Sequence, residues 1–160
     1  MTQKKHTETE DELSVLLSTR DITIAGRAMV IREYTLTDML HLGAPLDALT
    51  HSLADAMKTP WPAIEEIEAV LRKHASDMPE LMARSVDQPV QWVAQLPASD
   101  GQNLIDWWWT QNRRFFMNAV VRLETIRATR AKLSASAASL QPSREPVTTP
   151  PGSEATHSAS

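Results

Sequence analysis

A chain of 160 residues has room for one domain with a modest hydrophobic core. Its formal net charge of −4 argues against a general affinity for nucleic acid, and the absence of cysteine excludes disulfide bonds and thiolate chemistry. The N-terminus lacks the apolar core of a signal peptide, and no apolar run approaches the roughly 18 residues that span a membrane. We therefore expect a soluble intracellular protein with no membrane partner.

The N-terminal part combines a charged segment with a predicted hairpin. Residues 1–12 are charged and lack periodicity, which predicts a disordered arm. The apolar residues after it can form a short anchoring turn; they are Leu13, Val15, Leu16 and Leu17. Residues 20–34 alternate around Ala25-Gly26-Arg27, which is typical of a β-hairpin. A lone hairpin is marginal in water, so we expect it to lie on the long helix described below.

Four shorter helices are predicted before residue 96. The first, at about 37–57, has Thr35 or Thr37 as its cap, and Pro45 kinks or divides it. The other three are expected at about 60–75, 78–85 and 88–95. Asp87 is the expected N-cap of the last one.

The chain is organised around a long helix predicted from Leu96 to Leu133. Ser99 can serve as its N-cap, and Gln102, three residues on, can close a capping box. At about 100° per residue its large apolar side chains form one broad stripe, which is typical of a helix packed on a core. The stripe contains Leu104, Ile105, Trp108, Trp109, Phe115, Phe116, Ala119, Val120, Leu123 and Ile126, and Leu133 extends it.

Four residues of this helix do not fit a plain core helix. Asn112 falls within the apolar stripe, and because a buried amide is costly unless paired, we expect it to have a partner such as the hairpin backbone. Trp107, Met117 and Val121 fall on the opposite, polar side. Two interpretations stay open for Trp107: another helix covers it, or it is an exposed anchor that concentrates binding energy. Under the second, these three residues form a partner-binding surface.

The composition changes from Ser134 onward to Ala, Ser, Thr and Pro without aromatic residues. Such a segment cannot bury enough apolar surface to order itself, so we predict a disordered tail at 134–160. The remaining prediction is one α+β domain at 13–133, mostly α. In it an N-terminal β-hairpin packs on a helical bundle with one long C-terminal helix, between two disordered ends.

Catalytic and metal-binding patterns are missing from the sequence. His51 and Asp55 have the helical i, i+4 spacing of metal ligands, but two ligands do not make a site. The acidic cluster Glu65, Glu66 and Glu68 is expected on a solvated helix face. The glycines are too scattered for a phosphate loop, and no serine has the context of a nucleophile elbow. We therefore predict a protein that is not an enzyme and needs no metal or cofactor.

Basic residues gather near the end of the long helix. Six basic residues and one acidic residue lie between Arg113 and Lys132, which makes this part a candidate nucleic-acid surface. On a helical wheel, however, the basic side chains spread around the cylinder, and cations near a helix C-terminus also complement its dipole. Nucleic-acid binding is therefore the weaker interpretation.

Two stretches together resemble a known family. They are ITIAGRAMVIREYTL, at 22–36, and LPASDGQNLIDWWWTQNRRFFMNAVVR, at 96–122. In this order they resemble small tail assembly proteins of Mu-like tailed phages and prophages, of the tail-assembly-chaperone kind. The similarity covers about 15–36 and 90–123 best, while the helices between match only in type.

The resemblance implies a non-enzymatic role in the host cytoplasm. Such chaperones coat the long, helical, apolar tape-measure protein and keep it soluble, and they then yield to tail tube subunits, so they are absent from the finished virion. The implied partners are the tape-measure protein and the tail tube protein, and self-association into a homo-oligomer stays open. Two alternatives compete with this role: a nucleic-acid-binding phage regulator that uses the basic end of the long helix, and a structural tail component that stays in the particle.

Overall fold

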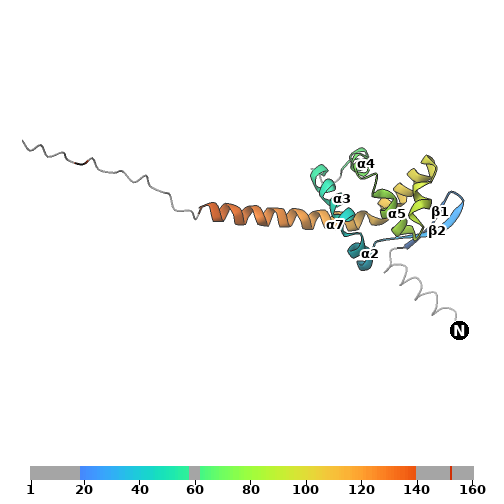
Figure 1. The fold of residues 1–160 in the computed structure, drawn as a ribbon, viewed down its shortest axis with the longest axis horizontal. Coiled ribbons are helices and arrows are strands. Elements are labelled where there is room, and N and C mark those ends of the chain that lie inside the picture. Colours follow the sequence, from blue (N-terminus) through green and yellow to red (C-terminus); the bar gives the residue numbers. More distant parts are fainter. Residues whose placement is uncertain (1–18, 58–61, 140–151, 153–160) are drawn as a thin grey trace, which may run out of the picture. The chain divides into compact units, whose positions relative to one another are not determined.

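A two-stranded sheet followed by helices makes up the described part of the chain. The computed structural model describes residues 19–57, 62–139 and 152. Its elements, in chain order, are β1 (Thr19–Ile24), β2 (Arg27–Arg32), α2 (Leu36–His41), α3 (Gly43–Ala56), α4 (Ile64–Lys73), α5 (Met78–Val86), α6 (Val90–Ala94) and α7 (Ala98–Ser139) (Figure 1). The predicted fold class is confirmed: α+β, mostly helical, with an N-terminal hairpin and a long C-terminal helix.

Some predictions fall on residues that the structure does not describe. They are the arm at 1–12, the turn at 13–17, the first residues of the helix predicted at 60–75, with Trp61, and most of the tail beyond Ser139. No helix in the described ranges combines the length and the apolar character needed to cross a membrane.

The chain divides into two compact units, Met1–Arg127 and Ala128–Ser160. In the smaller unit the structure describes the last residues of α7, whose side chains are exposed. α7 ends at Ser139 and not at Leu133 as predicted. Alanine has the highest helix propensity, and no proline occurs between Pro97 and Pro142, so residues 134–139 can continue the helix. The larger unit holds all the other elements.

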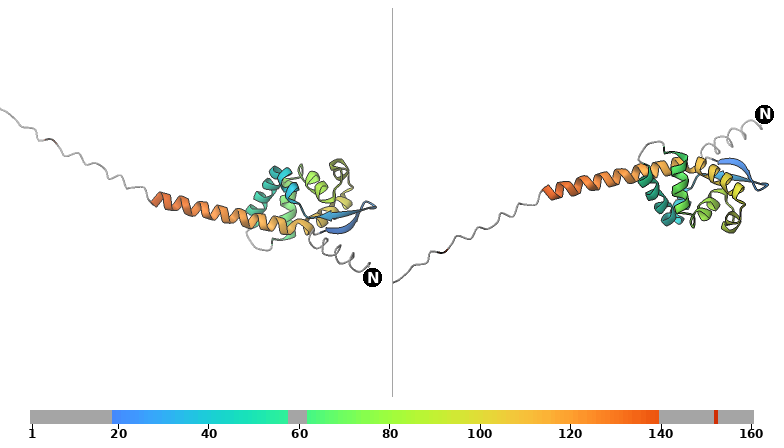
Figure 2. Two further views of the ribbon diagram at one scale, coloured as in Figure 1. Left: turned by 90° about the horizontal axis from the view of Figure 1, so that it is seen from below. Right: turned by 90° about the horizontal axis from the view of Figure 1, so that it is seen from above.

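The hairpin turns through two residues with positive φ. Ala25 has φ 49° and Gly26 has φ 74°, the pattern of a turn whose twist matches that of the flanking strands. The backbone N–H of Ala25 donates to Oδ1 of Asp100 at 3.3 Å, which ties the turn to the start of α7. The hairpin lies beside the N-terminal part of α7 (Figure 2), and β2 also contacts α5, so the long helix that was expected to support the hairpin is one part of its support.

The predicted helix at 37–57 is divided, but the break falls at Leu42 and not at Pro45. Pro45 lies in the first turn of α3, where a missing N–H costs nothing because that N–H would have no partner within the helix. Thr35 caps α2, as predicted. Its hydroxyl accepts from the backbone N–H of Asp38, and the Asp38 carboxylate accepts from the backbone N–H of Thr35.

Two predicted N-caps are wrong. Asp87 ends α5 in the left-handed conformation, with φ 53°, while α6 begins later, after Pro89. The N–H of Gly101 donates to the carbonyl of Pro97 at 2.8 Å, which places Ser99 inside the first turn of α7 and not before it. Both errors have one cause: the residue before each helix is a proline, Pro89 or Pro97, which has no side-chain acceptor, whereas Ser, Thr, Asp and Asn are the usual N-cap residues.

The core lies along one side of α7. Five residues at four-residue spacing are buried: Leu104, Trp108, Asn112, Phe116 and Val120. The ring of Phe116 lies 5.4 Å from that of Trp108 and 5.1 Å from that of Phe115, centroid to centroid. The predicted stripe is thus core up to Val120. Its outer end is not, because Ile126 is 50% exposed.

Candidate functional site

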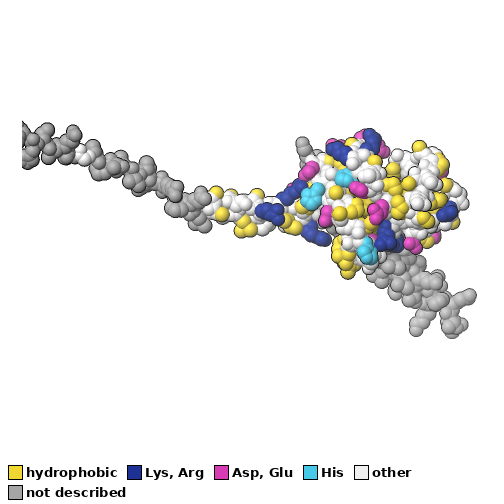
Figure 3. Space-filling model, viewed as in Figure 1, with side chains coloured by type: hydrophobic (Ala, Val, Ile, Leu, Met, Phe, Trp, Pro, Cys, Tyr) yellow, Lys and Arg dark blue, Asp and Glu magenta, His cyan; other side chains and the backbone are white. Residues whose placement is uncertain are grey.

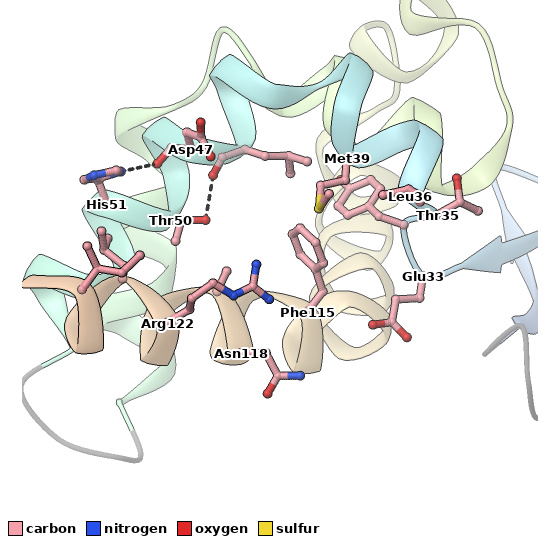
Figure 4. A pocket seen from close by; sticks show the side chains of 15 residues that line it. Glu33, Thr35, Leu36, Met39, Asp47, Thr50, His51, Phe115, Asn118 and Arg122 are labelled. Carbon is pink, nitrogen blue, oxygen red and sulfur yellow. Dashed lines mark hydrogen bonds between the residues drawn. The ribbon is translucent and has the colours of Figure 1, made fainter.

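A groove of about 380 Å³ runs between α7 and the pair α2 and α3; we call it the α2–α7 groove (Figure 4). Its floor consists of the buried side chains of Tyr34 and Leu46 and the half-buried side chains of Met39, Phe115 and Ala119. Volumes of a few hundred Å³ with a mostly apolar lining are typical of binding pockets. The floor is therefore suited to an apolar occupant.

Two large aliphatic side chains stand at the edges of this groove. Leu36, on α2, is 69% exposed, and Ile126, on α7, is 50% exposed. Leu40 lies one turn after Leu36 and is also 69% exposed, but it does not line the groove. The space-filling view shows hydrophobic side chains at the surface over α2 (Figure 3). Covering the two edge residues would remove apolar surface from water, which favours an occupant.

Two polar side chains of α3 in the groove, those of Thr50 and His51, make hydrogen bonds within their own helix. The Thr50 hydroxyl donates to the carbonyl of Leu46 at 2.7 Å. Nδ1 of His51 lies 2.8 Å from the carbonyl oxygen of Asp47, so Nδ1 carries the proton of that bond (Figure 4). These two side chains therefore need no polar partner from an occupant.

Three charged side chains line the groove and are available to an occupant. The carboxylates of Glu33 and Asp47 and the guanidinium of Arg122 make no ion pair or side-chain hydrogen bond with any residue that the structure describes. Arg122 and Phe115 both point from α7 toward α2 and α3 (Figure 4). By contrast, Arg127 is paired with Asp55 at 2.9 Å. The groove therefore offers one cation and two anions to a partner.

A charge cluster fixes α2 beside the hairpin. Asp38, which is buried, pairs with Arg32 of β2 and with Nε of Arg84 of α5, the latter at 3.0 Å. Burial alone would raise the pKa of Asp38, but the hydrogen bonds from Arg32 and Thr35 outweigh it and lower that pKa from 3.8 to about 2. The carboxylate is therefore ionised at neutral pH, and it holds the α2 wall of the groove in place.

A second network fixes Tyr34, which forms part of the floor. The backbone N–H of Tyr34 donates to Oδ1 of Asn112 at 3.1 Å, and its hydroxyl donates to the carbonyl of Leu81 at 2.8 Å. Nε1 of Trp108 donates to the same hydroxyl at 2.8 Å. Burial raises the pKa of Tyr34, so the phenol stays protonated and keeps its role as a donor.

The expectation that Asn112 has a partner near the hairpin backbone is confirmed. Besides accepting from Tyr34, just after β2, it donates through Nδ2 to Oγ of Ser85 at 3.0 Å and to the carbonyl of Trp108 at 3.1 Å. Ser85 in turn donates to the carbonyl of Arg32. No buried side-chain nitrogen or oxygen in the described ranges lacks a partner. This one amide therefore joins the hairpin exit, α5 and α7.

The three residues predicted to bind a partner differ in how far they are covered. Trp107 is half-buried: it packs against the core, and the guanidinium of Arg20 lies 5.2 Å from its ring centroid. Part of its cover thus comes from Arg20 of the hairpin. Met117 is half-buried against the core, whereas Val121 is 65% exposed. Trp107 lines a hollow beside the hairpin, and a partner surface made from all three residues stays a prediction.

Other predicted candidates are apart in the structure. His51 binds a backbone carbonyl, and Asp55 pairs with Arg127, so the spacing of these two does not bring them together. Among the residues that the structure describes, no three histidine or acidic side chains gather where they could hold a metal ion.

The α2–α7 groove was not predicted from the sequence, although one signal for it exists. Leu36, Met39 and Leu40 crowd apolar side chains onto α2, a helix too short to bury all of them. The apolar stripe of α7 also continues past Val120, beyond the elements that cover it. The sequence therefore indicates that α2 and α7 each carry more aliphatic side chains than their neighbours can cover. It does not indicate that these side chains lie at one common groove, because that depends on tertiary packing.

Comparison with known proteins gives one match. A search of curated proteins finds no match, and neither does a search of solved structures. The profile of one family matches residues 12–152, which is most of the chain. The chain therefore belongs to the family of unknown function DUF6631.

Proposed function

We propose that this protein is a non-enzymatic chaperone of phage tail assembly, which holds an apolar helix of the tape-measure protein in the α2–α7 groove. The observation that carries the proposal is the apolar floor of that groove between the exposed side chains of Leu36 and Ile126. The resemblance of residues 22–36 and 96–122 to tail assembly chaperones supplies the biological setting.

The groove has the dimensions of a helix-binding site. Its α7 wall runs from Phe115 to Ile126, about 16 Å at the rise of an α-helix, which is about three turns. An amphipathic helix laid along this wall would present anchors at i, i+3, i+4 and i+7. The half-buried Met39 adds an adaptable side chain to the floor, which suits a chaperone that meets successive segments of a long partner.

Reversibility follows from the small size of the site. Covering Leu36 and Ile126 contributes about 1–2 kcal/mol each, because each side chain is already partly covered. Such an interaction can hold an apolar helix in solution and still yield when tube subunits offer a larger interface. The unpaired charges at Glu33, Asp47 and Arg122 would orient the occupant more than tighten its binding.

Nucleic-acid binding gains no support from the geometry of the basic residues. Arg127, at the centre of the basic part of α7, is engaged by Asp55 and Glu124, each at 2.9 Å. A phosphate would have to compete with both carboxylates for this guanidinium.

The proposal can be tested by co-expression of the chain with the tail proteins encoded beside its gene, followed by pull-down. The expected result is capture of a long helical protein by the parent chain. Leu36→Asp should lose that capture, because the carboxylate lies at the groove edge, while Leu40→Asp should retain it. The two leucines are on the same helix and equally exposed, so Leu40→Asp controls for the added charge and for folding.

Three outcomes would contradict the proposal. Capture of no tail protein by the parent would contradict the chaperone role. Equal capture by the Leu36→Asp and Leu40→Asp variants would show that the groove does not bind the partner. Retention of the chain on DNA at low salt, lost steeply as salt rises, would favour a nucleic-acid regulator.

A further inference from the structure

The sequence before β1 carries a pattern that the proposed function has not used. Residues 8–17 read ETEDELSVLL: an acidic run, Glu10 to Glu12, followed by Leu13, Leu16 and Leu17. The three leucines have the i, i+3, i+4 spacing that places side chains on one face of a helix. The segment thus combines an apolar face with an acidic end.

The register of the hairpin brings the start of β1, which this segment precedes in the chain, to one end of the α2–α7 groove. Thr19 is paired with Arg32 across the sheet, and directly opposite residues of antiparallel strands lie about 5 Å apart. The next residue after Arg32 is Glu33, which lines the groove, and Leu36 follows within a turn. Residues 16–17 are therefore only two or three positions along the chain from the groove entrance.

The length and the charge order of the segment both match the groove. From Leu17 to Asp11 a helix spans about 9 Å, and from Phe115 to Arg122 α7 spans about 10 Å. With the leucines at the Phe115 end, where the chain enters, the acidic run arrives at Arg122. The guanidinium of Arg122 has no partner among the described residues, so it is available for this contact.

From these observations we infer that residues 8–17 of the same chain occupy the α2–α7 groove when no partner is bound, with the leucines on its apolar floor and the acidic run at Arg122. This inference deepens the proposed function and rests on the same groove: the segment is a placeholder that a partner helix displaces. Asp47, on the α3 wall, repels the same acidic run, which keeps the placeholder displaceable.

Because the chain has no cysteine, disulfide trapping in the full-length protein tests the inference directly. The first variant combines Leu16→Cys with Leu36→Cys, and the matched control combines Leu16→Cys with Leu40→Cys. Leu36 and Leu40 are equally exposed, so a freely moving segment would reach both at similar rates. Docking in the groove should make the first disulfide form about tenfold faster or more, as a monomer on a non-reducing gel, because docking raises the local thiol concentration.

The charge contact is tested in the same Leu16→Cys, Leu36→Cys background. Arg122→Glu should slow trapping several-fold, and so should reversal of the acidic run with Glu10→Lys, Asp11→Lys and Glu12→Lys. Combining both changes should restore the rate, a recovery that loss of folding cannot produce. Equal rates for the two cysteine pairs, cross-linked dimers in place of monomers, or charge changes without effect would each overturn the inference.

These outcomes separate the inference from the proposed function, since trapping needs no partner. Rapid trapping in a chain that captures no tail protein would support the placeholder and refute the chaperone role. Loss of capture by Leu36→Asp, together with equal trapping rates, would support the chaperone role and refute the placeholder.

Discussion

Replacing Asn112 with leucine should destabilise the larger unit by about 2–4 kcal/mol. Leucine has the same number and branching of side-chain heavy atoms as asparagine, so no cavity is left and the cost comes mainly from lost hydrogen bonds. The buried N–H of Tyr34 loses its acceptor, for which about 1–3 kcal/mol is typical. Ser85 loses a donor but keeps its bond to the Arg32 carbonyl, so its share is smaller. The Trp108 carbonyl keeps its own backbone bond within α7.

The assay is a urea melt followed by circular dichroism, with Asn118→Leu as the matched control. Asn118 is on the same helix but exposed, so the same substitution there should change stability by no more than about 0.5 kcal/mol. If Asn112→Leu were as stable as the control, the amide would not be what joins the hairpin, α5 and α7. The Asn112 hydrogen bonds would then not be what holds Tyr34 in the groove floor.

Three further predictions concern stability. Because the pKa of folded Asp38 lies below its ordinary value of 3.8, the carboxylate stabilises the fold above about pH 4, and about 2 kcal/mol should be lost as the pH falls toward 2. Melts across this range should show less of this slope in Asp38→Asn, and an unchanged slope would refute the ion cluster. Phe116→Ala should cost about 3–5 kcal/mol in a denaturant melt, and a loss below about 1 kcal/mol would mean that the α7 stripe is not core. Deleting residues 134–160 should leave the thermal midpoint nearly unchanged, because the described side chains there are exposed; a large drop would show that this segment packs on the domain.

Local chemistry explains which parts of the fold could be predicted. The hairpin turn needs a residue that accepts positive φ, and Gly26 therefore indicates the position of the turn. Asn112 stands out because an amide within an apolar stripe needs a partner, and the structure supplies it from the chain just after β2. In both cases the chemistry of one residue limits the local structures that it can adopt.

Where several local solutions cost about the same, the sequence did not decide between them. Ser99 and Asp87 are good N-cap residues, yet neighbouring prolines begin both helices. Pro45 could have broken a helix or begun one; the break falls at Leu42, and Pro45 lies in the first turn of α3. Such choices are made by tertiary contacts.

The candidate site could not be predicted for the same reason. Leu36 and Ile126 lie 90 positions apart in the sequence, and each looks like an ordinary core residue of its own helix. Their exposure at the edges of a common groove follows only from how α2 and α7 are placed. Trp107, which lies on the polar side of the helical wheel, is partly covered by Arg20 of the hairpin.

The most direct test of helix binding in the α2–α7 groove is a calorimetric titration. A purified tape-measure helix is titrated into the full chain and into its Leu36→Asp and Leu40→Asp variants. We expect Leu36→Asp to weaken binding of the helix by about 2 kcal/mol or more, roughly 30-fold, as for an interface anchor. Leu40→Asp should bind within about 0.5 kcal/mol of the parent. Equal affinities for the parent and both variants would contradict the claim that the α2–α7 groove holds the partner.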